Sequence, residues 1–167
     1  MPRAARFRIA AIEDLLAQLR YAPDDTRLKQ MNAAERLLAE VDPDRSYPED
    51  FVTFRITGYR PDSGATPATF VGGALVSDLV IFIQALSDEL AIAVSDLGRS
   101  PLSLAEVAAR LRVSGKTVQR YRRLGLVCHY VTGEGGPRRL VCFEDALEAF
   151  ATRHAERVTR AAGFSRV

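Results

Sequence analysis

The sequence has little cysteine and no long hydrophobic run. Its two cysteines, Cys128 and Cys142, are too few for the disulfide framework of a small secreted protein. The most apolar run, residues 72–86, contains Asp78 and Gln84 and is shorter than the roughly 20 residues that a membrane span needs. We also recognise no N-terminal signal peptide. These absences predict a cytoplasmic protein that has no membrane partner.

Catalytic and metal-binding patterns are missing as well. Residues 115–117 resemble the end of a phosphate-binding loop, but Arg110 stands where that loop needs a glycine. His129 follows Cys128, and neighbouring residues point to opposite faces of a strand. The sequence contains no Cys-x-x-Cys spacing and no recognisable Ser/His/acid set. We therefore expect neither an enzyme nor a bound metal or cofactor.

Charge is divided unevenly along the chain. Residues 1–98 contain 10 Lys and Arg against 15 Asp and Glu, a net −5, whereas residues 99–167 contain 13 against 6, a net +7. The turn-forming run Gly98-Arg99-Ser100-Pro101 falls at the same place. Such an asymmetry indicates one part that faces a polyanion and another that does not. We predict an acidic helical domain over residues 1–97 and a basic domain over residues 98–167.

The first domain should be mostly helical. Apolar residues at helical spacing predict helices over residues 6–20 and from Asp24 or Asp25 to Pro43. Residues 46–61 give conflicting signals, because Ser46-Tyr47-Pro48-Glu49 is typical of a capping box while the following residues alternate as in a strand. We favour a helix there. Residues 72–90 predict a further amphipathic helix.

The second domain begins with the pattern of two short helices joined by a tight turn. Ser103-Leu104-Ala105-Glu106 is a capping box that starts the first helix. The turn follows at Arg112, and Ser114 can cap a second helix over residues 115–124, which Gly125 ends. This spacing is typical of a helix-turn-helix.

The second of these helices separates apolar from basic residues. At about 100° per residue, Val118 and Tyr121 share one side. The opposite side, which we call the outward face, consists of Lys116, Gln119, Arg120 and Arg123. Arginine can bond bidentately with guanine and glutamine with adenine, and both Lys and Arg neutralise phosphates. Ser114 and Thr117 are candidates for phosphate contacts at the helix start. Arg122, beside the apolar side, is expected to reach a phosphate or an acidic residue rather than a base.

A β-hairpin is predicted over residues 126–143, with its tip at 133–137. Taking Gly135 as the midpoint places Tyr130 opposite Leu140, Val131 opposite Arg139 and Cys128 opposite Cys142. The facing cysteines permit a disulfide, but buried thiols in the cytosol usually pack as small hydrophobic groups. As the wing of the motif, Arg138 and Arg139 could contact the DNA backbone or the minor groove. A solvated hairpin tip is the alternative.

The last predicted element is a helix over residues 144–162, with acidic residues at its start and Gly163 as its stop. His154 lies on its apolar stripe and is expected to be packed rather than catalytic. The predicted fold class is therefore mostly α: a helical N-terminal part, then a winged helix-turn-helix with a two-stranded hairpin and a C-terminal helix.

Several segments of the second domain match one known pattern: residues 102–108, 113–118, Tyr121, residues 125–126 and residues 143–150. Together they resemble the MerR/excisionase-type winged helix-turn-helix, over about a third of the chain. The resemblance implies binding to duplex DNA.

A wider pattern runs from residues 47–48 and 54–61, through 78–79 and 86–87, to 157–158 and 164–165. It is similar to the N-terminal extension of certain large bacterial sigma-70 class factors, in which this module precedes the polymerase-binding regions. That family implies promoter DNA and RNA polymerase as partners. The sequence departs from the family by stopping at Val167, where those regions would be expected to start, so the usual polymerase-binding surfaces are not carried over.

We therefore predict a DNA-binding transcription factor, a sigma-factor-like or MerR-like regulator. Two alternatives stay open. In one, the motif is the scaffold of a protein-interaction adaptor whose arginines meet an acidic partner. In the other, the protein is an excisionase-like architectural factor that bends DNA. The sequence is compatible with a homodimer.

Overall fold

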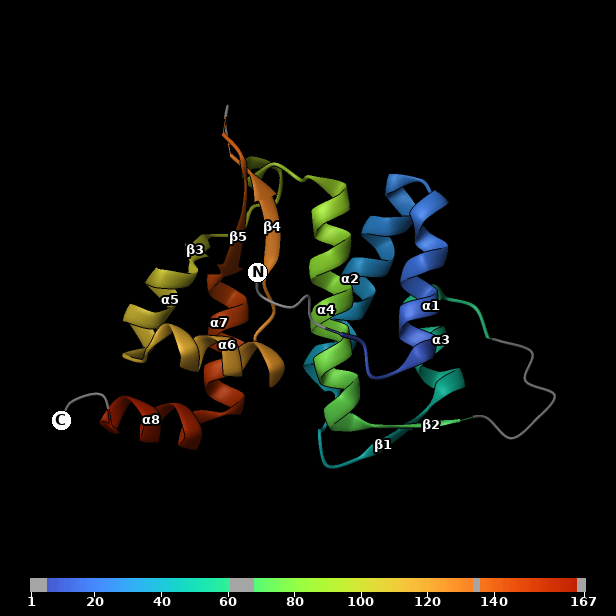
Figure 1. Ribbon diagram of the computed structural model, residues 1–167. Coiled ribbons are helices and arrows are strands. Elements are labelled where there is room, and N and C mark those ends of the chain that lie inside the picture. Colours follow the sequence, from blue (N-terminus) through green and yellow to red (C-terminus); the bar gives the residue numbers. More distant parts are fainter. Residues whose placement is uncertain (1–5, 61–67, 134–135, 165–167) are drawn as a thin grey trace. The chain divides into compact units, whose positions relative to one another are not determined.

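The computed structural model describes residues 6–60, 68–133 and 136–164. Its contacts divide the chain into two compact units, a first unit Met1–Leu90 and a second unit Ala91–Val167. Helices predominate in both, and each contains a small antiparallel sheet (Figure 1). The predicted mostly α composition is confirmed.

The observed division precedes the expected boundary after Leu97, because residues 91–97 belong to the second unit. The Thr132 N–H donates to the Ile92 carbonyl at 2.9 Å. Val94 and Leu97 pack against buried residues of the hairpin. Residues 91–97, which the charge pattern assigned to the acidic domain, therefore belong to the second, basic unit because they contact its hairpin.

The first unit is built around its longest helix, α4 (Gly72–Leu90). Helix α1 (Ala10–Gln18), a 3-10 turn (Leu19–Tyr21), α2 (Asp24–Glu40) and α3 (Glu49–Thr57) precede it. Both α1 and α2 contact α4, and α3 contacts α2. The predicted helices are all present, although α1 begins later than expected. Despite the apolar character of α4, no helix among the described residues is long and apolar enough to cross a bilayer.

The ambiguous segment contains both a strand and a helix. Strand β1 (Ser46–Pro48) pairs antiparallel with β2 (Thr69–Val71), and α3 follows β1 directly. The favoured helix is thus confirmed, but the capping box is wrong. The N-cap of α3 is Pro48, without a side-chain cap, because Ser46 lies in the strand, opposite Val71.

Two contacts fix the starts of α4 and α1. At the start of α4, Gly72 packs so tightly that an added Cβ would lie 2.1 Å from the Asp42 carbonyl oxygen. Farther along α4, the fully buried Asp78 carboxylate accepts hydrogen bonds from the N–H groups of Arg8 (2.9 Å) and Ile9 (2.7 Å), just before α1. Burial raises the pKa of the Asp78 carboxyl, and these hydrogen bonds oppose the shift.

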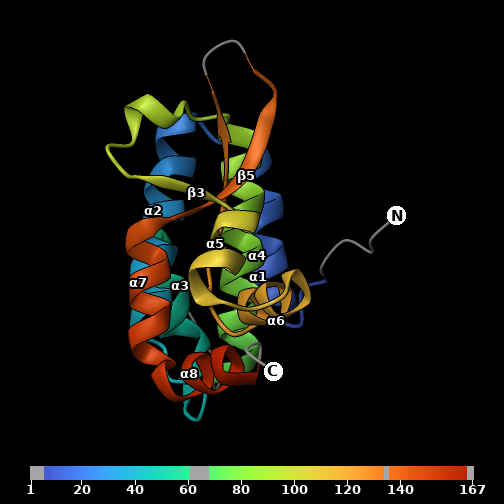
Figure 2. The ribbon, with the colours of Figure 1, turned by 90° about the vertical axis from the view of Figure 1, so that its left-hand side faces the viewer.

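In the second unit, the first strand of the sheet is separated in the sequence from the other two by two helices. Strand β3 (Pro101–Ser103) leads into α5 (Leu104–Leu111) and α6 (Gly115–Arg123); β4 (His129–Thr132), β5 (Arg138–Phe143), α7 (Glu144–Arg153) and α8 (Ala155–Phe164) follow. The strand order is β3-β5-β4, antiparallel throughout (Figure 1). Figure 2 shows β3 beside β5. The sequence did not predict β3, which adds a third strand to the hairpin.

The hairpin register is confirmed. Tyr130 lies opposite Leu140 and Val131 opposite Arg139, as the turn residues predicted. Cys128 lies just before β4, whereas Cys142 pairs across the sheet with Leu102 of β3. Continuing the β4–β5 register by one residue places the two cysteines opposite each other.

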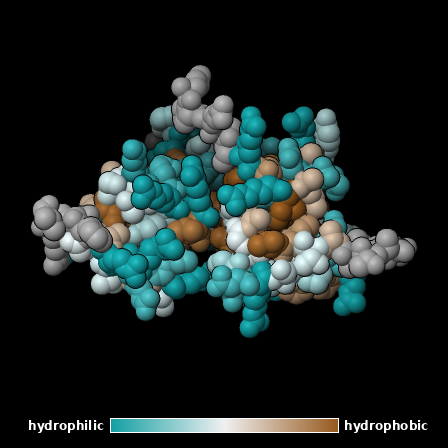
Figure 3. Space-filling view, turned by 60° about the horizontal axis from the view of Figure 1, so that its bottom comes forward, coloured by the Kyte–Doolittle hydropathy of each residue, from teal (hydrophilic) through white to brown (hydrophobic). Residues whose placement is uncertain are grey.

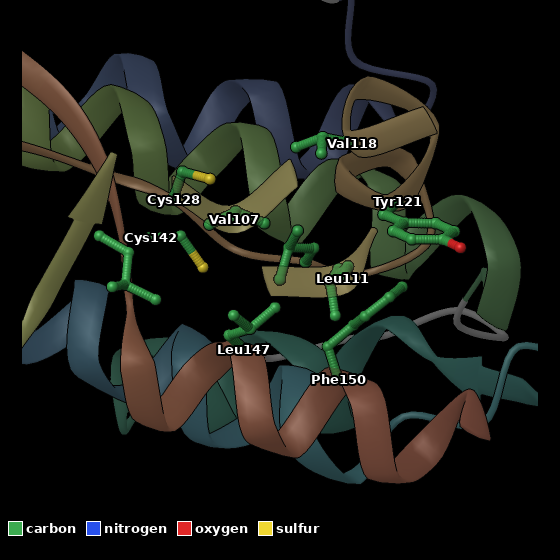
Figure 4. Packing of buried hydrophobic residues seen from close by; sticks show 10 residues of the cluster. Val107, Leu111, Val118, Tyr121, Cys128, Cys142, Leu147 and Phe150 are labelled. Atoms are coloured by element: carbon green, nitrogen blue, oxygen red, sulfur yellow. The ribbon is translucent and has the colours of Figure 1, made fainter. Parts of the chain in front are cut away.

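An apolar cluster joins α5, α6 and α7 of the second unit to its sheet (Figure 4). Its buried residues are Leu102, Val107, Leu111, Val118, Tyr121, Leu126, Cys128, Cys142, Leu147 and Phe150. Both cysteines are free, fully buried thiols. A hydrogen bond with Cys128, together with burial, raises the pKa of the Cys142 thiol, so we expect it to stay protonated and unreactive.

The prediction of one continuous last helix is wrong. The backbone leaves helical geometry at His154 (φ −115°, ψ 35°), which separates α7 from α8. Gly163 does not end the helix either, since α8 extends to Phe164. The apolar stripe that suggested one helix is buried in α7, at Leu147 and Phe150.

Candidate functional site

The start of α5 is fixed by the capping box that the sequence predicts. The Ser103 hydroxyl accepts a hydrogen bond from the Glu106 N–H (3.0 Å), and the Glu106 carboxylate accepts one from the Ser103 N–H (3.2 Å). The helix ends at Arg112, which has left-handed geometry (φ 57°, ψ 47°). The Val113 N–H then donates to the Ala108 carbonyl at 3.0 Å. These local bonds turn the chain sharply into α6.

Helix α6 begins with the predicted serine cap. The Ser114 hydroxyl accepts from the Thr117 N–H at 3.2 Å, and the two hydroxyl oxygens lie 3.1 Å apart. Both candidate phosphate-contacting residues therefore sit at the positive end of α6, Ser114 exposed and Thr117 half-buried. The helix ends at Arg123, followed by Gly125 with φ 119°.

The two sides of α6 differ as predicted. Val118 and Tyr121 are 1% and 2% exposed and pack into the apolar cluster. All four residues of the outward face are exposed: Lys116, Gln119, Arg120 and Arg123. Burial of the opposite side fixes the rotation of α6 about its axis, so these four side chains are held on one surface of the unit.

The three cations of the outward face carry uncompensated charge. Within the described part of the chain, Lys116, Arg120 and Arg123 have no ion-pair partner. Other arginines of the same unit are neutralised: Arg99 pairs with Asp145 at 2.9 Å, and Arg110 with Glu144 at 2.8 Å. These three side chains therefore give the exposed side of α6 a net positive charge.

Arg122 and Gln119 are linked in a way that the sequence did not suggest. The half-buried Arg122 guanidinium donates to the Gln119 side-chain oxygen at 2.8 Å. Arg122 therefore contacts the side-chain amide of a residue one turn earlier in the same helix. The bond occupies the Gln119 carbonyl group and leaves its NH₂ group as the end that can donate to a ligand.

The predicted wing residues lie at the start of β5. Arg138 and Arg139 are both exposed. The Arg138 guanidinium lies 5.5 Å from the centre of the Tyr130 ring, a cation–π distance that orients the side chain along the hairpin. Residues 134 and 135 of the tip, including the predicted midpoint Gly135, lie outside the described residues.

A cavity that the sequence did not reveal lies where α6 meets the junction of α7 and α8. This corner pocket has a volume of about 830 Å³. It is lined by Ser114, Thr117, Arg120, Tyr121, Leu124, Thr152, Arg153, His154, Ala155, Glu156, Arg157, Arg160 and Ala161. The pocket exists because the chain bends at His154, and the continuous helix that we predicted would have no such corner.

Hydrophilic side chains cover most of the surface of the second unit on the side that carries α8 (Figure 3). Among the residues described, no group of three or more His, Cys, Asp or Glu side chains is placed to hold a metal ion. The chemistry available around α6 is therefore that of cations, hydroxyl groups and an amide.

Comparison of the chain with protein-family models, with curated proteins and with solved structures finds no match.

Proposed function

We propose that the second unit is a winged helix-turn-helix that binds duplex DNA, with α6 as the recognition helix in the major groove. The observation that carries the proposal is the uncompensated charge of Lys116, Arg120 and Arg123 on the exposed side of a helix whose other side is buried. The major groove accommodates an α-helix, and phosphates supply the missing counter-charge.

Each outward residue has a role in this arrangement. Arg120 and Arg123 donate to guanine or to phosphate oxygens, and Lys116, in the first turn, neutralises a phosphate. Gln119 donates through its NH₂ group, since Arg122 holds its carbonyl oxygen. Ser114 and Thr117 bring hydroxyls and the positive end of α6 to the backbone.

The hairpin supplies a second contact. Arg138 and Arg139 are exposed at its outer end, where they would lie on the backbone or enter the minor groove beside the site read by α6. Side chains of this kind add affinity that depends little on sequence.

A role in transcription is supported by the resemblance of the second unit to the MerR/excisionase-type module and of the wider chain to the sigma-factor extension. We propose a sequence-specific regulator acting on promoter DNA, with RNA polymerase as a second partner. The protein carries out no catalytic reaction in this proposal and needs no cofactor.

The proposal is tested by selecting bound sequences from a random duplex pool with the whole protein. We expect a defined motif to be enriched, and a symmetric motif would show binding as a dimer. With Gln119→Ala, the preference at one base position should weaken while the rest of the motif remains. Failure of the wild-type protein to enrich any sequence would contradict the proposal and favour a protein-interaction adaptor.

A further inference from the structure

The corner pocket combines charge with apolar walls. Arg120 of α6 faces it from one side, and Arg157 and Arg160 of α8 from the other. Leu124 and Ala161 contribute apolar surface. Cavities of about 300–1,000 Å³ are typical of small-molecule sites, and the volume of about 830 Å³ falls within this range.

Positive potential reaches into this pocket. Burial lowers the pKa of His154, and the charges of Arg153 and Arg157 lower it further. Glu156 is the single acidic residue among the lining residues described. The pocket therefore favours an anion over a cation or a neutral ligand.

A buried hydroxyl in the wall lacks a partner. Tyr121 is 2% exposed, and its ring packs against Phe150 with centroids 5.1 Å apart. Among the described residues its hydroxyl makes no hydrogen bond. Figure 4 shows this oxygen at the edge of the apolar cluster, turned away from the cysteines. An unsatisfied buried hydroxyl is destabilising, and a hydrogen bond to an oxygen atom of a ligand would remove that cost.

We propose that the corner pocket is a binding site for the phosphate group of a small organic phosphate. The Tyr121 hydroxyl donates to one phosphate oxygen, and Arg120 and Arg157 neutralise the charge as arginines do in charge-assisted bonds. The remainder of the ligand lies against Leu124 and Ala161.

The pocket also provides a means of regulation, a consequence that rests on the proposed DNA-binding function. Arg120 belongs both to the pocket and to the outward face of α6. A phosphate held in the pocket engages this guanidinium and lowers the positive charge that α6 offers to DNA. Ligand binding therefore weakens DNA binding.

The site is tested by NMR titration of the whole protein, without DNA, using inorganic phosphate and then pyrophosphate. Sodium chloride at matched ionic strength is the reference. We expect saturable shifts in the amides around Tyr121 and Arg157, with binding about tenfold weaker in Tyr121→Phe and in Arg157→Gln. Tyr121→Phe keeps the ring and its packing, so it remains folded. Arg36→Gln, at an exposed position of α2 in the first unit, should bind phosphate as the wild type does.

Two results would overturn the site: shifts no larger than those caused by chloride, or equal affinity in all three variants and the wild type. A second titration uses a DNA duplex. If DNA shifts the same amides and free phosphate and pyrophosphate do not, the pocket takes a phosphate of the DNA backbone and the small-ligand proposal is wrong. If phosphate binds but no duplex does, the pocket stands and the DNA-binding proposal fails.

Discussion

The two units of the chain use arginine in different ways. In the first unit, Arg55 pairs with Glu40 at 2.5 Å, and Arg27 lies 3.6 Å from Glu89. In the second unit, the cations of the outward face have no such partner within the described residues. Exposed pairs add little stability, so the difference concerns the electrostatic potential more than folding. Lys116, Arg120 and Arg123 therefore leave positive potential on the exposed side of α6.

The units also start their helices differently. The N-caps of α1, α2 and α3 are Ile9, Pro23 and Pro48, and none provides a side-chain cap. In the second unit, Ser103 and Ser114 cap α5 and α6, whereas the N-cap of α7, Phe143, provides no side-chain cap. The first unit thus depends on contacts between distant segments, whereas the site-bearing helices of the second are positioned by local hydrogen bonds.

Gly72→Ala should destabilise the first unit the most. The new methyl group would meet the Asp42 carbonyl at 2.1 Å and the Arg45 carbonyl at 2.7 Å, and backbone cannot move aside as a flexible side chain can. We expect a loss of about 3 kcal/mol in the free energy of unfolding, measured by urea denaturation. Gly73→Ala, whose nearest neighbour atom is 3.9 Å away, should not lower it. Equal stability of the two variants would contradict the packing described here.

Asp78→Ala removes the carboxylate that accepts hydrogen bonds from the backbone just before α1. The N–H groups of Arg8 and Ile9 lose their acceptor, and we expect the free energy of unfolding to fall by about 2 kcal/mol. The exposed Asp14 of α1 provides the matched control, because Asp14→Ala removes a carboxylate without removing a partner of a buried group. If both variants unfold at the same urea concentration, α1 does not depend on Asp78.

Ser103→Ala tests a local cap in the second unit. It removes the acceptor of the Glu106 N–H and with it one half of the capping box. Loss of such a cap costs about 1 kcal/mol, less than the loss expected for Asp78→Ala. Ser100→Ala, at an exposed serine before β3, is the control. A larger effect from Ser103→Ala than from Asp78→Ala would reverse the contrast between the units.

The smallest effect concerns pH. Because burial and the charges of Arg153 and Arg157 lower the pKa of His154 from 6.5, the unfolded chain takes up this proton at a higher pH than the folded protein does. His154 therefore contributes stability above pH 6.5 that is lost as the pH falls through its folded pKa. In His154→Gln, thermal unfolding followed between pH 7.5 and about 5 should show a shallower decline. If the stability of His154→Gln and of the wild type falls equally over this pH range, the protonation of His154 does not cause the loss of stability.

Features encoded by neighbouring residues were predictable from the sequence. The capping box at Ser103, the cap at Ser114 and the register around Tyr130 and Leu140 depend on side chains and turns within a few positions of one another. The exposed outward face followed from helical periodicity, since burial of Val118 fixes where the other side chains point. Local chemistry therefore defined most of the candidate DNA-binding site.

Features made by distant segments were not predictable. Strand β3 is three residues long, and only its pairing with β5 makes it a strand. The bend at His154 could not be predicted because the helical spacing of apolar residues continues across it. The corner pocket, which depends on that bend, was therefore not predicted either. The bond between Arg122 and Gln119 joins residues three positions apart, but it depends on side-chain rotamers that residue spacing does not specify. For β3, the deciding contact lies outside the local sequence.

The most direct test of the account is the salt dependence of DNA binding, measured by fluorescence anisotropy on a random-sequence duplex. For Arg120→Ala/Arg123→Ala, the slope of log affinity against log salt should be smaller than that of the wild type by about two units, one for each lost phosphate contact. Arg45→Ala/Arg60→Ala removes the same charge from exposed positions of the first unit and should leave the slope unchanged. If the two double variants lose affinity equally, or if Arg120→Ala/Arg123→Ala binds as the wild type does, α6 is not the DNA-binding surface.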